Sequence, residues 1–124
     1  MKVIDDLWIL TEEGTVIFSR VLNAKIQDQL FGALMSALNI FSQRFSDDGL
    51  KQFKLNKMQF VLMKSKNLLF IANTLRIEKS QKVDNELTQV IQLFFKRYSS
   101  VLEQWDGDIT VFSDFIKDLD VVTS

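Results

Sequence analysis

The side chains best placed to do chemistry are six carboxylates near the C-terminal end of the chain. They are Glu103, Asp106, Asp108, Asp114, Asp118 and Asp120. A calcium loop needs further oxygen ligands at alternate positions, whereas the acid after Asp108 comes six residues later, inside an amphipathic segment. Aspartates near the start of a helix are stabilised by its positive end. We therefore expect a solvated helix terminus here and no bound metal.

The residue types that most enzymes require are missing or isolated. The chain has no histidine and no cysteine, so the usual neutral-pH general base and the commonest metal ligands are absent. The four glycines stand singly at positions 14, 32, 49 and 107, which excludes both a P-loop and a dinucleotide-binding fingerprint. Glu12 and Glu13 are adjacent turn residues whose side chains need not point the same way. We predict no catalytic residues, no cofactor and no enzymatic activity.

Charge is distributed unevenly along the chain. Between Gly49 and Ile77 every charged residue is basic, whereas the C-terminal acids are accompanied only by Lys117. The basic residues are Lys51, Lys54, Lys57, Lys64, Lys66 and Arg76. Two interpretations are open. The lysines keep sheet edges solvated and discourage aggregation, or they form an electrostatic footprint for an acidic protein or an anionic membrane surface.

Length and composition indicate one cored domain, residues 1–124. Hydrophobic residues make up 47% of the chain and eleven are phenylalanine, which is enough bulk for a two-layer core in a chain too short for two domains. The net charge of −1 argues against a nucleic-acid partner. The N-terminus lacks the apolar run of a signal peptide, and no stretch approaches the roughly 20 apolar residues of a membrane span. We expect a cytoplasmic protein without a transmembrane segment.

The hydrophobic pattern predicts an α/β (α+β) fold, with a five-stranded antiparallel sheet, one helix between strands 2 and 3, and two C-terminal helices. A hairpin is expected over residues 6–21, with Gly14 in its turn. Alternating apolar residues predict three more strands between residues 50 and 75. Helical spacing predicts a core-facing helix over residues 82–105 and a short final helix that carries Phe112, Phe115, Ile116 and Leu119 on one face.

The first helix is predicted over residues 25–45 and has apolar residues on two sides. Relative to Leu30, five of them fall within about 60°, which is typical of a core-facing stripe: Ile26, Leu34, Ala37, Phe41 and Phe45. Phe31 and Met35 lie about 100° and 140° away from Leu30. Two interpretations are open for this second strip. It binds a protein, with Gly32 admitting a partner's backbone, or a neighbouring loop or the C-terminal helix covers it.

The order of these elements, together with two segments, resembles the longin domain, a profilin-like fold of the roadblock/longin superfamily. Trp8-Ile9-Leu10, Gly14 and Phe18-Ser19-Arg20 are similar to that family's opening hairpin. The segment from Phe60 to Ala72 resembles its fourth and fifth strands with their short polar turn. Roadblock domains usually begin with a helix, whereas this chain begins with a strand, which favours the longin branch.

The resemblance implies a non-catalytic adaptor or regulator in vesicle trafficking or signalling. The implied partners are a small GTPase or another longin or roadblock domain, including a homodimer, with transient contact at a membrane surface. Longin domains commonly use their first helix and third strand as a platform, which gives a candidate protein interface of Phe31, Gly32, Met35, Phe53, Lys54 and Leu55. An alternative from another class is a small-molecule sensor with a pocket between sheet and helix.

Overall fold

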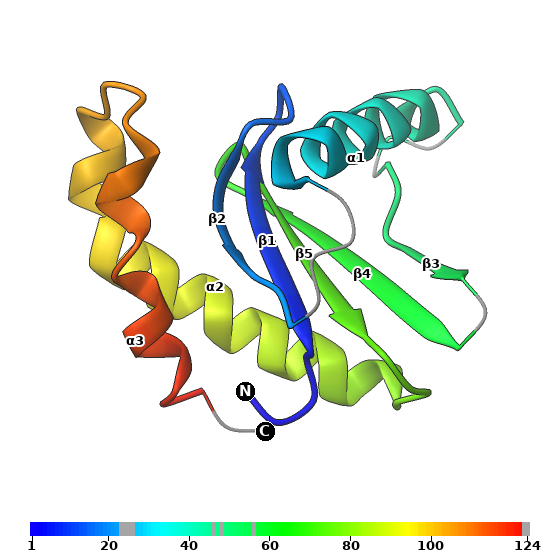
Figure 1. The fold of residues 1–124 in the computed structure, drawn as a ribbon. Coiled ribbons are helices and arrows are strands. Elements are labelled where there is room, and N and C mark those ends of the chain that lie inside the picture. The colour runs from blue at the N-terminus through cyan, green and yellow to red at the C-terminus, as the bar shows by residue number, and fades with distance from the viewer. Residues whose placement is uncertain (23–26, 46, 48, 56, 123–124) are drawn as a thin grey trace.

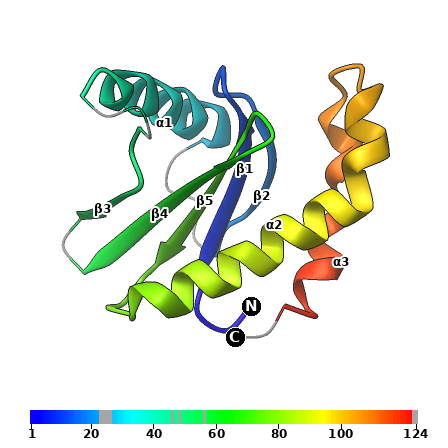
Figure 2. The ribbon, with the colours of Figure 1, turned by 180° about the vertical axis from the view of Figure 1, so that it is seen from behind.

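A five-stranded antiparallel sheet forms the centre of the molecule, which confirms the predicted fold class. The structure of the chain is a computed structural model, and it describes residues 1–22, 27–45, 47, 49–55 and 57–122, without the side chain of Leu55. In the order β2-β1-β5-β4-β3, the strand bounds are β2 Val16–Arg20, β1 Asp6–Thr11, β5 Leu68–Thr74, β4 Met58–Ser65 and β3 Gln52–Leu55. Figure 1 and Figure 2 show one helix on one face of the sheet and the C-terminal helices on the other. These are α1 (Asp28–Gln43) and, opposite, α2 (Ser80–Glu103), the 3-10 helix η1 (Ile109–Phe112) and α3 (Phe115–Leu119).

Two tight turns set the register of the hairpins. In the β1–β2 turn, Gly14 adopts a φ of +97°, a conformation that glycine adopts at little cost. The β4–β5 turn is made by Lys66 and Asn67, whose φ angles of 49° and 68° suit a two-residue hairpin that follows the twist of its strands. Ser65 and Leu68 face each other across this turn.

The larger core lies between the sheet and the helices α2 and α3. Phe94 is fully buried at its centre. Five rings from the sheet, α2, η1 and α3 lie 5.0 to 5.7 Å from its own, namely those of Phe70, Phe95, Tyr98, Phe112 and Phe115. Aromatic pairs in such tilted and edge-to-face arrangements each add about 0.5–1.5 kcal/mol beyond the burial of their area. The core-facing side predicted for α2 is confirmed by this cluster.

A buried carboxylate ties the N-terminus to this core. Glu86 has no exposed surface, and its two oxygens accept hydrogen bonds from the backbone N–H groups of Val3 (2.8 Å) and Ile4 (3.3 Å). The ammonium group of Met1 donates a hydrogen bond to the carbonyl of Leu119 at 3.2 Å. The first residues of the chain therefore pack against both α2 and α3.

Helix α1 approaches the sheet through small and polar residues. Gly32 lies so close to the β1–β2 turn that a Cβ atom built on it would come 2.2 Å from the carbonyl oxygen of Gly14. One helical turn later, the Ser36 hydroxyl donates a hydrogen bond to the carbonyl of Glu12. Asn39 is buried on the same side. The backbones of α1 and the turn are therefore in direct contact.

This contact reverses the predicted orientation of α1. Phe31 and Met35 are 7% and 3% exposed, and the Phe31 ring stacks on Trp8 at a centroid distance of 4.1 Å in a second core. The predicted core stripe is exposed instead, at Leu30, Leu34, Ala37, Phe41 and Phe45; Ile26 lies outside the described residues. The prediction followed hydrophobicity alone and was wrong, because close contact at Gly32 leaves no room for large side chains on the face that meets the turn.

The final predicted helix is divided in two, η1 and α3. Phe112, Phe115 and Leu119 are buried as expected, whereas Ile116 is 50% exposed because α3 is only five residues long and buries a narrow face. Within the described ranges, no helix has both the length and the hydropathy needed to cross a membrane.

Candidate protein-docking surface

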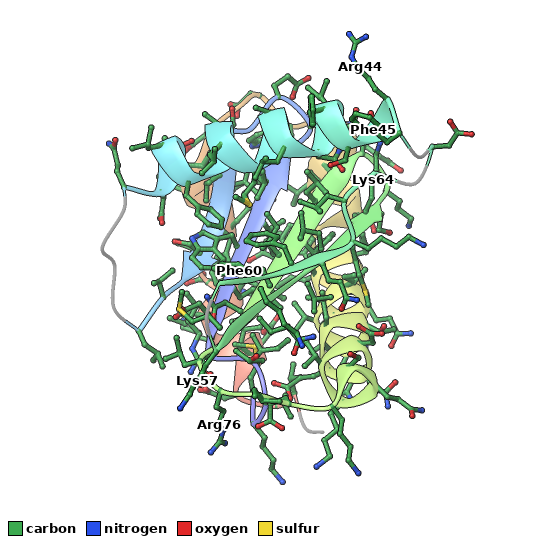
Figure 3. The ribbon with its side chains drawn as sticks, turned by 90° about the vertical axis from the view of Figure 1, so that its right-hand side faces the viewer. Arg44, Phe45, Lys57, Phe60, Lys64 and Arg76 are labelled. Atoms are coloured by element: carbon green, nitrogen blue, oxygen red, sulfur yellow. The ribbon has the colours of Figure 1, made fainter. Side chains whose placement is uncertain are left out.

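An apolar stripe runs along the outward side of α1. We term it the outer stripe; its large members are Leu30 (63% exposed), Leu34 (51%), Phe41 (60%) and Phe45 (79%), with Ala37 between them. The rings of Phe41 and Phe45 meet edge to face at 5.3 Å, and Figure 3 shows Phe45 at the C-terminal end of the helix. Exposed apolar residues usually occur singly, so three large ones on α1 and a fourth just after its end form a candidate contact surface.

Polar contacts at its first turn hold α1 in this orientation. The side chain of Gln29 both accepts a hydrogen bond from the backbone N–H of Val16 and donates one to its carbonyl, each at 3.0 Å. The hydroxyl of Ser19 donates to the carboxylate of Asp28. Together with the contact at Gly32, these bonds fix the rotation of the helix about its axis. The outer stripe therefore stays on the surface.

Strand β3, which the platform was expected to use, lies at the edge of the sheet. The Phe53 ring is half-buried and lies nearly parallel to the Phe60 ring, at a centroid distance of 4.5 Å and an angle of 4°. Lys54 is exposed, and strand alternation places it on the opposite face from Phe53. The side chain of Leu55 lies outside the described residues. An edge strand leaves one row of backbone groups open to pairing with another chain.

A groove opens beside β4 next to the start of β3. Met58 to Val61 pair with β3, and the part of β4 that runs on to Ser65 lines an open groove of about 820 Å³. We term it the edge groove. Its walls include Asn39 and Gln43 from α1 and Asp84 and Ile91 from α2. Lys64 lies at this edge and forms an ion pair with Glu12 at 3.0 Å.

The structure places the predicted interface residues in two groups. Phe31, Gly32 and Met35 are buried against the sheet, so their predicted position on an exposed strip is wrong. Gly32 does admit a backbone, but that backbone belongs to the Gly14 turn of the same chain. The stretch Phe53-Lys54-Leu55 lies on the third strand, as expected, and the structure places that strand at the sheet edge. Its role in binding stays a prediction.

Sequence reasoning assigned the outer stripe to the core and so missed it as a surface. One signal could have identified it. Gly32, Ser36 and Asn39 fall on a common helix face, and all three are small or polar. A glycine at the centre of such a face is typical of a helix that approaches another backbone closely.

The C-terminal carboxylates make local contacts. Asp108 accepts hydrogen bonds from the hydroxyl and the backbone N–H of Thr110, at 2.7 and 3.0 Å, and these bonds lower the pKa of its carboxyl group. Asp118 and Asp114 lie 2.7 and 3.9 Å from the Arg97 guanidinium. Across the described part of the chain, no three acidic side chains are grouped as metal ligands would be.

A family model matches most of the chain. Residues 5–104 match the model described as the first longin domain of FUZ, MON1 and HPS1. A search of curated proteins gives no match.

Two solved structures share the fold. The Roadblock/LC7 domain from Streptomyces avermitilis aligns with a TM-score of 0.63 at 16% identity, covering 79% of this chain and 87% of that one. Myxococcus xanthus MglB aligns with a TM-score of 0.52 at 12% identity, covering 72% of this chain and 84% of that one. At these identities the likeness concerns the fold alone.

Proposed function

This chain belongs to the longin family represented by the first longin domains of FUZ, MON1 and HPS1, and on that basis we propose that residues 1–124 form one non-catalytic protein-interaction module. Its role is that of an adaptor or regulator that works with small GTPases in membrane trafficking or signalling, as its resemblance to longin domains implies. A shared fold does not by itself establish a function. The proposal therefore depends on a feature of this chain, the outer stripe.

The exposure of the outer stripe carries the proposal. Its four large side chains are each more than half exposed, and removing apolar surface from water contributes about 25 cal/mol for each Å². Phenylalanine is enriched in the cores of protein interfaces. Because α1 is fixed on the sheet by Gly32 and Gln29, a partner meets a preformed surface and little ordering entropy is lost on binding.

The partner that fits this surface best is another longin or roadblock domain, of the same or of a different chain. Such a domain has a helix that could lie along the outer stripe and an edge strand that could pair with β3, so that apolar surface and open backbone groups are covered together. Lys54, exposed on β3, would orient an acidic partner and raise the association rate. A small GTPase then binds the pair or this domain directly.

A pull-down from native cytosol, run in parallel with a GTP analogue and with GDP, tests the proposal. The test variant is Leu34→Ser with Phe41→Ser, which alters the outer stripe and leaves the core intact. The matched control is Ile116→Ser with Val121→Ser, two exposed aliphatic residues in the C-terminal segment. We expect the wild type and the control to capture the same longin, roadblock or GTPase protein, and the outer-stripe variant to lose it.

Equal capture by all three proteins would contradict the proposal. The melting temperature of the outer-stripe variant should stay within a few degrees of that of the wild type, because both substituted residues are exposed. Its measurement shows that any loss of capture comes from the changed surface and not from unfolding. If a GTPase is captured, enrichment with the GTP analogue indicates an effector, whereas enrichment with GDP indicates binding of the exchange type.

The small-molecule sensor is the second candidate, and the edge groove is the feature that favours it. The groove has about 820 Å³ of volume, within the range of ligand pockets. However, many of its lining side chains are polar or charged, including Gln43, Lys51, Lys64 and Asp84, whereas ligand pockets are lined mostly by apolar groups. A metabolite retained in native mass spectra of the purified protein would favour the sensor over the docking module.

A further inference from the structure

A second group of exposed apolar side chains lies at the end of the sheet where β5 leads into α2. Leu75 and Ile77 follow β5 and are 47% and 76% exposed, and Leu22 follows β2 and is 62% exposed. We term these three residues the apolar tip. They lie beside the start of β1 at Asp6, whereas α1 packs on the Gly14 turn that follows the other end of β1. The apolar tip is therefore separate from the outer stripe.

Two adjacent aspartates hold the two connections of the apolar tip together. The carboxylate of Asp6 accepts a hydrogen bond from the backbone N–H of Leu22 at 2.8 Å, and the carboxylate of Asp5 accepts one from the backbone N–H of Leu75 at 2.7 Å. The backbone N–H of Asp5 donates to the carbonyl of Asn73 at 2.9 Å, which ties the pair to the end of β5. The backbone is thus fixed at both connections, and the aliphatic side chains are left exposed on it.

Basic side chains share this end of the molecule. Arg76 stands between Leu75 and Ile77, and Figure 3 shows Arg76 and Lys57 at the end remote from Arg44. Lys79 and Lys82 follow at the start of α2, and both are exposed. The one acid between residues 75 and 82 is Glu78, whose side chain is 18% exposed and forms an ion pair with Arg76 at 3.1 Å. Three carboxylates at the apolar tip have local partners: Glu78 pairs with Arg76, and Asp5 and Asp6 accept backbone hydrogen bonds. The exposed lysines beside it, Lys57, Lys79 and Lys82, present positive charge to the surroundings.

We propose that the apolar tip docks on the surface of an anionic lipid bilayer. Leucine and isoleucine side chains would enter the headgroup region, while the surrounding lysines and arginine would face acidic lipids. Each basic residue near such a surface contributes about 1 kcal/mol, and reversible membrane binding commonly combines an apolar and a basic signal. Both signals are present on the same connections.

A bilayer fits this site better than an acidic protein does. The three aliphatic side chains come from two separate connections, and the edge groove is lined by other residues. A folded protein would need a matching hollow for each side chain, because tight protein interfaces require complementary shapes. A bilayer adapts to projecting side chains of any arrangement. Basic residues with long apolar stems suit its interface, since the stems reach inward and the charged groups stay in water.

Membrane docking at the apolar tip leaves the outer stripe accessible. The six residues of β1, at about 3.3 Å each, separate the two regions by about 20 Å. A module bound to the bilayer through the apolar tip therefore still presents α1 to a protein partner. The two contacts are independent, so each can be removed without the other.

Vesicle co-sedimentation of the purified chain tests the proposal. The vesicles are phosphatidylcholine alone or phosphatidylcholine with phosphatidylserine, at low and at raised salt. We expect binding only to the phosphatidylserine vesicles and a decrease with salt. Leu75→Ser with Ile77→Ser should weaken binding about tenfold or more, because the inserted apolar groups are lost. Neutralising one basic residue, Lys57→Gln or Lys79→Gln, should weaken it about fivefold.

Two control variants make the outcome specific. Ile116→Ser with Val121→Ser removes exposed aliphatic residues away from the apolar tip, and Leu34→Ser with Phe41→Ser alters the outer stripe; both should bind vesicles as the wild type does. The proposal is overturned if the wild type does not sediment with phosphatidylserine vesicles at low salt, or if the Leu75 and Ile77 variant binds them equally well. Loss of a captured acidic protein by that variant, without vesicle binding by the wild type, would assign the apolar tip to a protein partner instead.

Discussion

Single residues determine which side of α1 faces the sheet. Gly32 and Gly14 bring two backbones into contact, and Ser36 adds a hydrogen bond to the same turn. Any side chain at position 32 would push the helix away, because a Cβ atom there would come 2.2 Å from a backbone oxygen and 2.8 Å from a methyl group of Val16. The exposed outer stripe is thus a consequence of the close contact at Gly32, together with the hydrogen bonds of Ser36 and Gln29, on the opposite face.

The substitution Gly32→Ala tests this contact. The added methyl group must displace the β1–β2 turn, and overpacking of this kind typically costs about 1–3 kcal/mol. Alanine also has a higher helix propensity than glycine, but we expect the packing cost to exceed this gain, so that the free energy of unfolding decreases. Urea denaturation measures the loss. Ala33→Ser, at an exposed neighbouring position, should change the free energy of unfolding by no more than about 0.5 kcal/mol. Equal stability of the Gly32→Ala variant and the wild type would contradict the close contact.

Asp6 provides a second test at the residue scale. Its burial raises the pKa of the carboxyl group above the ordinary value, although the hydrogen bond from the Leu22 N–H opposes the shift. The folded chain then binds this proton more tightly than the unfolded chain does. The contribution of Asp6 to stability is therefore present at low pH and lost as the pH rises through the raised pKa.

The variant Asp6→Asn keeps an oxygen that can accept the Leu22 N–H but carries no charge. We expect its free energy of unfolding, relative to the wild type, to increase as the pH is raised from about 4, the pKa of an unfolded aspartate, to neutrality. Urea denaturation at both pH values measures the difference. Asp47→Asn, at an exposed position, controls for the removal of one negative charge. A relative stability that decreases with pH would contradict the buried position of Asp6.

At the scale of elements, α1 shows where hydrophobic periodicity succeeds and fails. Periodicity correctly predicted its presence, as it did for the hairpin and for α2, because each of these elements carries the repeat of its own geometry. It did not predict the rotation of α1, since both sides of the helix carry large apolar residues. The choice between them depends on the tertiary contact of Gly32 with Gly14, which no local pattern contains.

Two phenylalanines on α1 form a matched pair that tests its orientation. Phe31→Ala removes a ring that is stacked on Trp8 and should cost about 3–5 kcal/mol. Phe41→Ala removes an exposed ring and should change the free energy of unfolding by about 0.5 kcal/mol or less. Residue type and helix are the same, so the difference reports burial alone. A larger loss of stability for Phe41→Ala than for Phe31→Ala would contradict this orientation. It would mean that the outer stripe faces the core, as hydrophobicity alone predicted.

At the scale of the whole molecule, the candidate surfaces occupy different parts of the sheet. The outer stripe and β3 offer apolar surface and open backbone groups, whereas the apolar tip offers aliphatic and basic side chains beside the start of β1. The basic segment recognised in the sequence contributes to both, through Lys54 on β3 and through Lys57 and Arg76 near the apolar tip. A chain that uses both surfaces would hold a protein partner close to a membrane.

The overall architecture could be predicted from the sequence more fully than the site. The order of strands and helices and the longin resemblance followed from patterns within each segment, and the placing of Phe53 and Lys54 on the third strand followed from that resemblance. The apolar tip could not be predicted, because Leu22 and Leu75 are brought together by the pairing of β2 and β5 on either side of β1 and by hydrogen bonds to Asp6 and Asp5. Contacts between residues distant in sequence decide which apolar groups remain exposed.

Site-specific photo-crosslinking in the native cell tests the central claim most directly. A photoreactive amino acid replaces Leu34 in the outer stripe and, in a control, Ile116 on α3; both positions are about half exposed, at 51% and 50%. We predict that the probe at position 34 crosslinks to a protein with a longin or roadblock domain, or to a small GTPase, and that the probe at position 116 does not. No crosslinked protein at position 34, or the same proteins at both positions, would contradict the assignment of the outer stripe as the docking surface.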